Sequence, residues 1–317
     1  MIQNKTESQS VDNYDDELYL WDLIQILLSK KWIIFGSTTM ATTIALVYSL
    51  FLPNIYESRV LLVPNDLNNQ SNLLQSYSGL ANLAGVGVPT QDTQSNSSKA
   101  IKKLSSLSFF ESNILPNIFL PNLIAIKSWN PDSNKINYKS NIYDVTTNTW
   151  VRDFSYPKKL IPSSQESFDI FQKKHLSISE DTKNNLVTLR VKHQSPYVAK
   201  KWAQLIIYEI NNFYREKDKY ETERAVKYLN TQMANTNFSE IKQGIAALLQ
   251  QEMQKLTLIE VNEFYVYDTI DPAVVMEEKS EPKRIVITIL GALLGGLLSA
   301  ILVIFRYFFN SEIGPDN

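Results

Sequence analysis

Few residues in this chain have the types and spacing that catalysis or metal binding requires. Only two histidines are present, His175 and His193, and neither lies in an HExxH-like pattern. In a strand-rich context, a lone histidine is more often a surface or hydrogen-bonded residue than a ligand. Two carboxylate pairs, Asp15/Asp16 and Glu277/Glu278, border the most apolar parts of the chain and are interpreted as solvated charges. We therefore predict no catalytic and no metal site.

The chain also lacks the motifs of several other classes of protein. It has no cysteine, which excludes thiol nucleophiles, zinc-thiolate sites and disulfides. Neither GxxxxGK[ST] nor GxSxG occurs, and Gly85-Val86-Gly87 lacks the third glycine and the preceding strand of a dinucleotide-binding loop. The formal net charge of -2 shows no basic excess of the kind that nucleic-acid binding needs. We predict a protein that is not an enzyme, has no cofactor and does not bind nucleic acid.

Apolar residues are concentrated in two blocks, residues 32–52 and 285–305, and neither block contains a charge. A bilayer core needs about 20 helical residues, so each block predicts a transmembrane helix. A cleavable signal peptide is the alternative for the first block, although the block is long and lies far from the N-terminus. A buried core helix is the alternative for the second, although it is apolar on all faces.

Two crossings would place both termini on one side of the membrane and residues 53–284 on the other. Lys30 and Lys31 precede the first block directly and favour cytoplasmic termini, which makes residues 1–31 a cytoplasmic segment and residues 306–317 a cytoplasmic tail. From Asp15 onward, apolar residues recur at helical spacing before the first block. They predict a short amphipathic helix on the membrane face, or a plain continuation of the transmembrane helix.

The domain between the blocks alternates between strand and helix patterns. Residues 65–98 are rich in Asn, Gln, Ser and Gly and predict a loop with an embedded helical turn, whereas residues 115–162 show weak periodicity and receive no assignment. Strands are expected at residues 56–64, 176–178, 186–192 and 263–270, and a short helix at residues 100–110. Because these strands come from both ends of the domain, we expect one small α/β unit.

Ser195-Pro196 predicts a helix start, with a capping hydroxyl followed by proline at the first helical position. No Gly or Pro intervenes from there to about Asn235, where the sequence Asn235-Thr236-Asn237-Phe238 breaks the pattern, which gives a helix of about 60 Å. Its charged middle contains the i,i+4 pairs Lys217/Glu221 and Lys219/Glu223. Asn237 and Glu240 resemble a capping box that starts a second helix over residues 238–260. Such a long solvated hairpin must project outward or run against a neighbouring chain.

The second apolar block contains a face with small residues. Gly291, Gly295 and Ser299 recur every four residues, and the first block offers Ser37, Ala41 and Ala45. Small residues allow two helices to approach closely in a membrane, although incidental small residues are the alternative. Pro272 and Pro282 mark a membrane-proximal linker before the second block. The predicted class is an α+β membrane protein in which two transmembrane helices flank an α/β domain with a long extended helical hairpin.

The residues resemble the chain-length determinant family, the bacterial polysaccharide co-polymerases that regulate O-antigen length. The resemblance runs from Asp15 to Phe308, although family members usually have more prolines between the last strand and the second span. It is carried by Asp16-Glu17-Leu18 to Lys31-Trp32, Pro53-Asn54-Ile55-Tyr56-Glu57-Ser58 to Pro64, Leu176-Ser177-Ile178 with Leu186-Val187-Thr188-Leu189, Ser195-Pro196-Tyr197-Val198-Ala199, and Ile270-Asp271-Pro272-Ala273 to Pro282-Lys283-Arg284.

The resemblance implies a bacterial inner-membrane protein with cytoplasmic termini, a periplasmic domain and a ring-like homo-oligomer. Its expected partners are further copies of itself, the O-antigen polymerase, the growing polysaccharide and membrane lipids. The alternative is an adaptor for capsule or exopolysaccharide export that works with a separate tyrosine kinase, since we expect no kinase fused after the second span. A membrane sensor or an unrelated enzyme is the third class.

Overall fold

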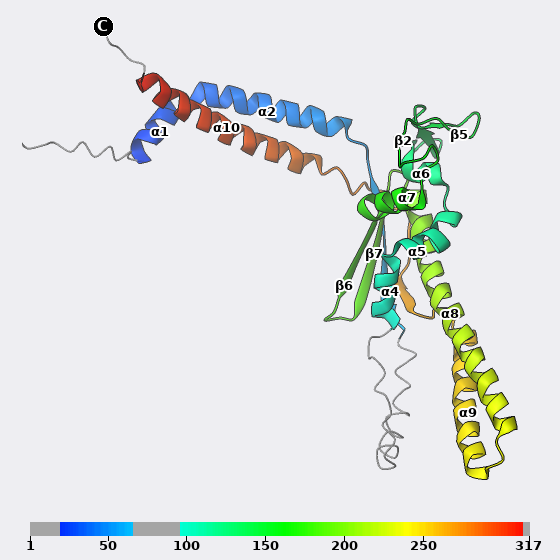
Figure 1. Cartoon of the computed structure of the whole chain (residues 1–317). Coiled ribbons are helices and arrows are strands. Elements are labelled where there is room, and N and C mark those ends of the chain that lie inside the picture. Colours follow the sequence, from blue (N-terminus) through cyan, green and yellow to red (C-terminus); the bar gives the residue numbers. More distant parts are fainter. Residues whose placement is uncertain (1–19, 66–95, 313–317) are drawn as a thin grey trace, which may run out of the picture. The chain divides into compact units, whose positions relative to one another are not determined.

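A computed structural model describes residues 20–65 and 96–312. The predicted helical turn around Leu80–Val86 and the Gly85-Val86-Gly87 sequence lie outside the described residues. The chain divides into two compact units, one formed by Met1–Leu52 with Pro282–Asn317 and the other by Pro53–Glu281. Figure 1 labels the elements of both units.

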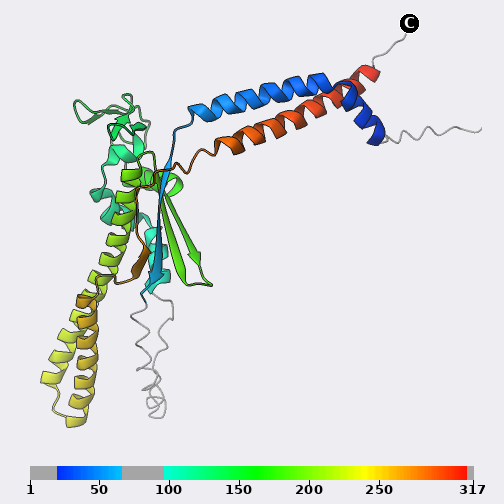
Figure 2. The same cartoon turned by 180° about the vertical axis from the view of Figure 1, so that it is seen from behind.

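Within its described residues, the first unit contains three helices, α1 (Leu20–Ser29), α2 (Lys31–Phe51) and α10 (Arg284–Glu312). A turn at Lys30 separates α1 from α2, so the amphipathic segment is an element of its own and not a continuation of α2. The helices α2 and α10 lie side by side in both views (Figures 1 and 2). Both are long and apolar enough to cross a membrane, and only 11% of the most apolar window of α10 is buried. A core helix would be mostly buried, which weighs against that alternative.

The second unit is built on a four-stranded antiparallel sheet with the order β6-β7-β1-β8. Its strands are β1 (Tyr56–Pro64), β6 (Leu176–Asp181), β7 (Leu186–His193) and β8 (Tyr267–Asp271). Alternate residues of β1 and β7 point to one face and are buried: Val60, Leu62, Val187, Leu189 and Val191. The sheet therefore joins segments from both ends of the domain, as the sequence predicts.

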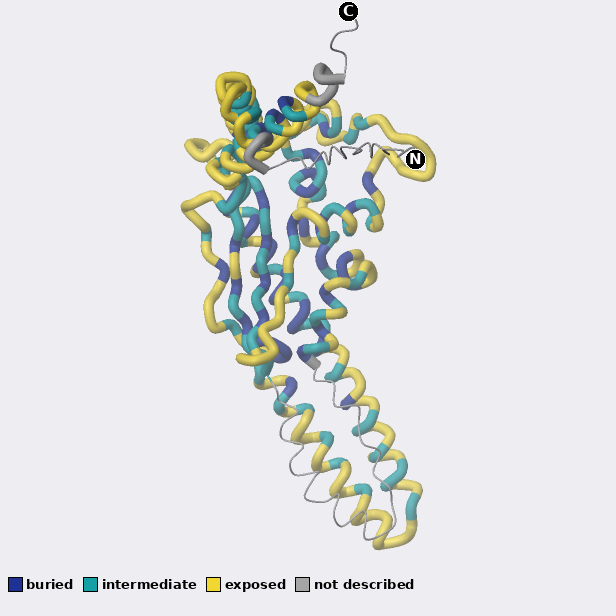
Figure 3. The backbone as a smooth tube through the Cα atoms, turned by 90° about the vertical axis from the view of Figure 1, so that its left-hand side faces the viewer, coloured by how far each residue is buried: buried dark blue, intermediate teal, exposed yellow. Residues whose placement is uncertain are grey.

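The helix α8 (Pro196–Asn235) covers the buried face of the sheet with Trp202, Ala203, Ile206 and Ile210. Short helical segments close the rest of the core: α4 (Asn96–Leu104), α5 (Leu107–Phe109), η2 (Phe110–Ile114), η3 (Leu115–Asn117), α6 (Leu120–Ile124), α7 (Ser164–Ile170) and η4 (Phe171–His175). Figure 3 shows the buried residues gathered on the sheet and on the half of α8 beside it.

Beyond the sheet, α8 continues as a hairpin with α9 (Ser239–Val261), in the place that the sequence predicts. The predicted i,i+4 pair of Lys217 and Glu221 is present, with 3.8 Å between Nζ and Oε1. Lys219 instead forms its ion pair with Glu260 of α9, at 2.5 Å, and not with Glu223. The i,i+4 spacing could not predict this partner, because Glu260 lies on the neighbouring helix.

Both predicted side-chain caps are wrong. Ser195 precedes α8 at the N-cap, but its side chain makes no capping hydrogen bond. The contact at this position is a different one, in which the Ser195 N–H donates to the imidazole of His193. The helix α9 begins one residue later than a cap at Asn237 requires, with Phe238 at the N-cap and no side-chain bond. The Asn237/Glu240 capping box is therefore absent.

Three predicted boundaries also differ. The helix expected over residues 100–110 is interrupted at Ser106, whose Oγ donates to the Lys103 carbonyl and accepts from the Phe109 N–H. The loop expected over residues 65–98 ends earlier, because α4 begins at residue 96. The strand expected from residue 263 begins only at Tyr267, because the N–H groups of Val266 and Tyr267 both donate to Asn211 of α8.

Residues 115–162, which the sequence left unassigned, form two small ribbons and part of the helical cover. One ribbon pairs β2 (Ile126–Asn130) with β3 (Lys135–Tyr138), and the other pairs β4 (Tyr143–Asp144) with β5 (Thr149–Trp150). Asn134 and Asn148 adopt positive φ angles in the two turns, a conformation that asparagine tolerates better than most residues. Strands this short carry too little periodicity to be predicted.

Candidate functional site

The helices α2 and α10 approach each other closely at Gly291 and Gly295. A Cβ atom added at Gly291 would overlap the Ala45 Cβ, and one added at Gly295 would overlap the Ala41 Cβ. Gly296 is less restricted, since its nearest neighbour would be the Thr38 Oγ1 at 3.7 Å. The two helices therefore approach so closely that only glycine fits at the first two positions.

Two further residues of the predicted small-residue face, Ser299 and Ser37, differ in burial. Ser299 is buried in the contact, and its hydroxyl donates to the Gly296 carbonyl. Ser37 is exposed and does not belong to the face. A helix has 3.6 residues per turn, so residues spaced by four drift about 40° around the helix at each step. The face of α2 that contacts the glycines of α10 therefore includes Thr38 and Ala41 but not Ser37. The leucines on the other side of α10 stay exposed for a surrounding solvent or lipid.

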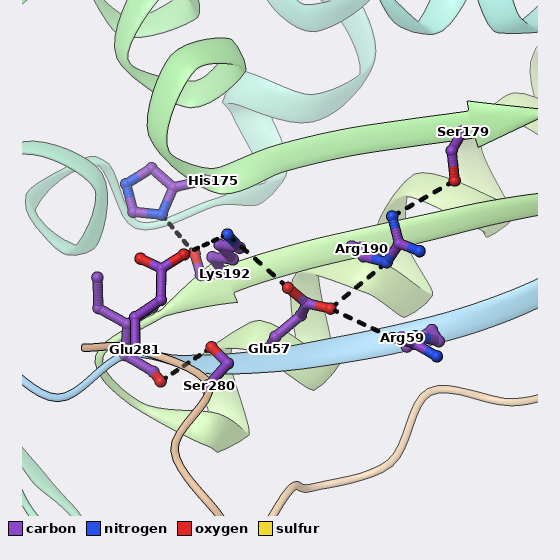
Figure 4. Close-up of polar contacts among 9 residues, drawn as sticks. Glu57, Arg59, His175, Ser179, Arg190, Lys192, Ser280 and Glu281 are labelled. Atoms are coloured by element: carbon purple, nitrogen blue, oxygen red, sulfur yellow. Dashed lines mark hydrogen bonds and ion pairs between the residues drawn. The ribbon is translucent and has the colours of Figure 1, made fainter. Parts of the chain in front are cut away.

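The open face of the sheet carries a row of alternating charges (Figure 4). Glu57 lies 3.5 Å from the Arg190 Nε and 3.9 Å from the Lys192 Nζ. Lys192 also contacts Glu281, with 2.5 Å between Nζ and Oε1. These charges connect the sheet to the last residue of the linker that follows β8.

The linker between Pro272 and Pro282 is held along the edge of β1. Ser58 donates from its hydroxyl to the Val274 carbonyl, and Ala273 is buried. Ile55 and Glu281 form a β-bridge, so the chain enters and leaves the second unit at one point. Pro272 belongs to the second unit and Pro282 to the first.

The two histidines are buried together and are not surface residues. Their ring centroids lie 5.7 Å apart, and both rings pack edge-on against Trp202, with centroid distances of 5.3 Å for His175 and 5.0 Å for His193. His193 Nδ1 accepts from the Ser195 N–H, so its Nε2 carries the proton and donates to the Asn122 carbonyl at 3.0 Å. His175 Nδ1 donates to the Lys192 carbonyl at 2.7 Å. Both rings are thus neutral hydrogen-bonded parts of the core.

This burial predicts that the second unit loses stability in mild acid. Burial lowers the pKa of both histidines, and that of His193 to about 4. Between pH 6.5 and pH 4, these histidines are protonated in the unfolded chain but stay neutral in the folded chain. The free energy of unfolding therefore falls as pH falls from 6.5 towards 4. We expect His193 to account for about 2 kcal/mol between pH 7 and pH 5.

Chemical denaturation at a series of pH values, for the natural protein and for His193→Gln, measures this effect. The variant is less stable at neutral pH but has a flatter pH dependence. An equal pH dependence of the free energy of unfolding in the two proteins would contradict its assignment to His193.

A hollow of about 310 Å³ lies between α8 and the segments on either side of β8. Tyr208, Asn212, Arg215, Glu263 and Phe264 are among the residues that line it. Aromatic faces beside amide and charged groups can hold a ligand by stacking and hydrogen bonds. Across the described ranges, no three His, Cys, Asp or Glu side chains come together in a way that could hold a metal ion.

Asn211, at the edge of this hollow, is the main residue that sequence reasoning missed. Its Oδ1 accepts from the N–H groups of Val266 and Tyr267, and its Nδ2 donates to the carbonyls of Ile207 and Tyr267. It thereby fastens the chain before β8 to α8. The sequence signal that could have indicated this role is the position of a polar residue, Asn211, directly after Ile210 of the apolar packing face of α8.

The family described as "Wzz: Chain length determinant protein" has a model that matches residues 16–114, less than half of the chain. No curated protein matches the chain. Two similar solved structures are a full-length bacterial polysaccharide co-polymerase and a fragment of WzzB, a polysaccharide co-polymerase from Salmonella Typhimurium. The first is 13% identical with a TM-score of 0.39, and 93% of this chain and 100% of that chain are covered. The second is 14% identical with a TM-score of 0.29, and the covered shares are 72% and 100%.

Proposed function

We propose that this chain, whose residues 16–114 match the model of the chain length determinant family, is a non-enzymatic regulator of O-antigen chain length. It acts beside the O-antigen polymerase, which forms the glycosidic bonds, and sets how many repeat units each polymer receives. The observation that carries the proposal is the family match across α2 and β1. The growing polysaccharide is a further partner, for which the hollow beside Tyr208 has suitable chemistry.

The regulator would be an inner-membrane protein that crosses the bilayer with α2 and α10. Lys30 and Lys31, next to the N-terminal end of α2, favour a cytoplasmic location for both termini. The second unit then lies in the periplasm. The low burial of both helices within the chain supports a lipid environment.

We further propose that several copies assemble through the α8–α9 hairpin. Its distal part leaves Tyr220, Tyr228, Phe238 and Leu248 exposed. Exposed apolar patches often mark contacts between proteins. Light scattering of the detergent-solubilised protein, with the detergent mass subtracted, is expected to give several subunits per particle. A homogeneous monomer would contradict the assembly.

Deletion of the gene, followed by electrophoresis of the lipopolysaccharide, tests the proposed function. We expect the modal band to disappear while O-antigen of irregular length persists, because polymerisation belongs to another protein. The alternative, an adaptor for capsule or exopolysaccharide export with a separate tyrosine kinase, predicts a loss of surface capsule and unchanged O-antigen. An assay of surface capsule on the same strain therefore separates the two functions.

A further inference from the structure

The segment Val145–Ile161, which includes β5 and the chain after it, exposes an unusual number of apolar side chains. Tyr156 is 96% exposed, and five more large apolar residues of this segment are exposed: Val145, Val151, Phe154, Leu160 and Ile161. Lys158 and Lys159 are exposed between them. Soluble surfaces rarely gather this much apolar area without a partner.

The segment is held in a defined position. The Arg152 guanidinium binds both carboxylate oxygens of Glu166, at 2.6 and 2.7 Å, and donates to the carbonyls of Lys159 and Leu160. Directly after β5, the Val151 N–H donates to the Ile142 carbonyl. The apolar side chains are therefore presented by a fixed loop, and the bond to Glu166 anchors that loop to α7.

The loop lies at the end of the second unit where β1 begins (Figures 1 and 2). The ring of Trp129 in the neighbouring β2–β3 ribbon packs on Tyr56 of β1, with 5.4 Å between the centroids. Tyr56 directly follows Ile55, which pairs with Glu281 where the chain enters and leaves the unit. The hairpin tip of α8 and α9 lies at the opposite end of this unit.

Short covalent connections lead from the bridge of Ile55 and Glu281 to both apolar helices. The cap residue of α2 is Leu52, three residues before Ile55, and α10 begins at Arg284, three residues after Glu281. Three residues span at most about 11 Å. If α2 and α10 cross a bilayer, the bridge of Ile55 and Glu281 therefore lies close to the lipid surface.

We propose that the segment Val145–Ile161 is a membrane-surface anchor. Its apolar side chains enter the headgroup region of the bilayer that α2 and α10 cross, and Lys158 and Lys159 face anionic lipid. Aromatic residues with neighbouring lysines are the combination that this interface favours. The inference rests on the proposed function only in requiring that the two helices span the membrane.

The absence of cysteine in the chain gives a direct test. Tyr156→Cys, in the full chain, is labelled with an environment-sensitive fluorophore and reconstituted into nanodiscs of anionic phospholipid with brominated acyl chains. We expect roughly half of the fluorescence to be quenched relative to unbrominated nanodiscs, because an interfacial anchor reaches the acyl boundary. Tyr228→Cys, which replaces another exposed tyrosine on the α8–α9 hairpin, is the control and stays unquenched.

A label at Ile44→Cys, within α2, separates the possible failures. Quenching at residue 44 without quenching at residue 156 overturns the anchor while the spanning helices stand. No quenching at either position overturns the spanning helices and the anchor together. If a second copy of the chain covers these apolar side chains, the fluorescence at residue 156 changes with protein concentration but not with bromination of the lipid. That result also overturns the anchor.

Discussion

Replacement of Gly291 and Gly295 by alanine is expected to separate α2 from α10. Each new methyl group would occupy the place of an alanine Cβ on α2, so the two backbones must move apart. Overpacking of this kind costs about 1–3 kcal/mol at each site, and lipid supplies no hydrophobic force that would restore the contact. If this contact positions the second unit beside the polymerase, the O-antigen becomes short or random in length.

The structure also specifies the rescue and the controls. Combining Gly291→Ala with Ala45→Gly moves one methyl group from one helix to the other, and the remaining neighbours then lie at 3.6 Å or more. This swap, together with its counterpart at Gly295 and Ala41, should restore the contact. Gly36→Ala meets nothing within 4 Å and should have no effect.

A cysteine pair measures the contact itself. Thr38→Cys and Gly296→Cys place two thiols on facing helices of a chain that has no other cysteine. After oxidation in membranes and proteolysis between the helices, the two fragments should stay joined in the otherwise natural chain. They should separate in the alanine variant and rejoin in the swap. Equal cross-linking in all three proteins would show that the glycines are tolerated and not required.

Asn211→Ala is expected to cause the second large effect, a loss of about 3–5 kcal/mol in the stability of the second unit. The substitution leaves the buried N–H groups of Val266 and Tyr267 and two carbonyls without their partner. An unmade hydrogen bond to a buried backbone group costs about 1–3 kcal/mol. The start of β8 should consequently detach from α8.

Thermal unfolding in mild detergent, followed by near-UV circular dichroism, measures this loss. Asn212→Ala is the matched control, since its neighbour Asn212 is only half-buried and bonds to the side chain of Arg215. We expect the control to unfold near the natural midpoint and Asn211→Ala well below it. Similar unfolding midpoints for the two variants would contradict the proposed role of Asn211 in holding the start of β8 on α8.

Local sequence signals predicted the elements that depend on local interactions. The run without Gly or Pro after Pro196 is one helix of 40 residues, and the alternation in residues 186–192 is a strand with one buried face. The apolar blocks likewise became α2 and α10. In each of these elements, the signal extends over enough consecutive residues to exceed the noise of single positions.

The elements that were missed depend on contacts between distant segments. Lys219 selects Glu260 across the hairpin, and Asn211 delays the start of β8. His193 lies in the core because its imidazole caps the turn before α8, which a search for metal ligands does not detect. Ser37 shows the same limit in the first unit, because four-residue spacing alone does not fix the rotation of a helix against its partner.

The distribution of polysaccharide lengths, measured while expression of this chain is switched on in a strain that lacks it, tests the central claim most directly. Electrophoresis of the lipopolysaccharide resolves the number of repeat units, and total O-antigen sugar is measured in parallel. A length regulator converts an irregular ladder into a modal cluster while the sugar per cell stays constant. An unchanged ladder, with the protein present in the inner membrane, would contradict the account.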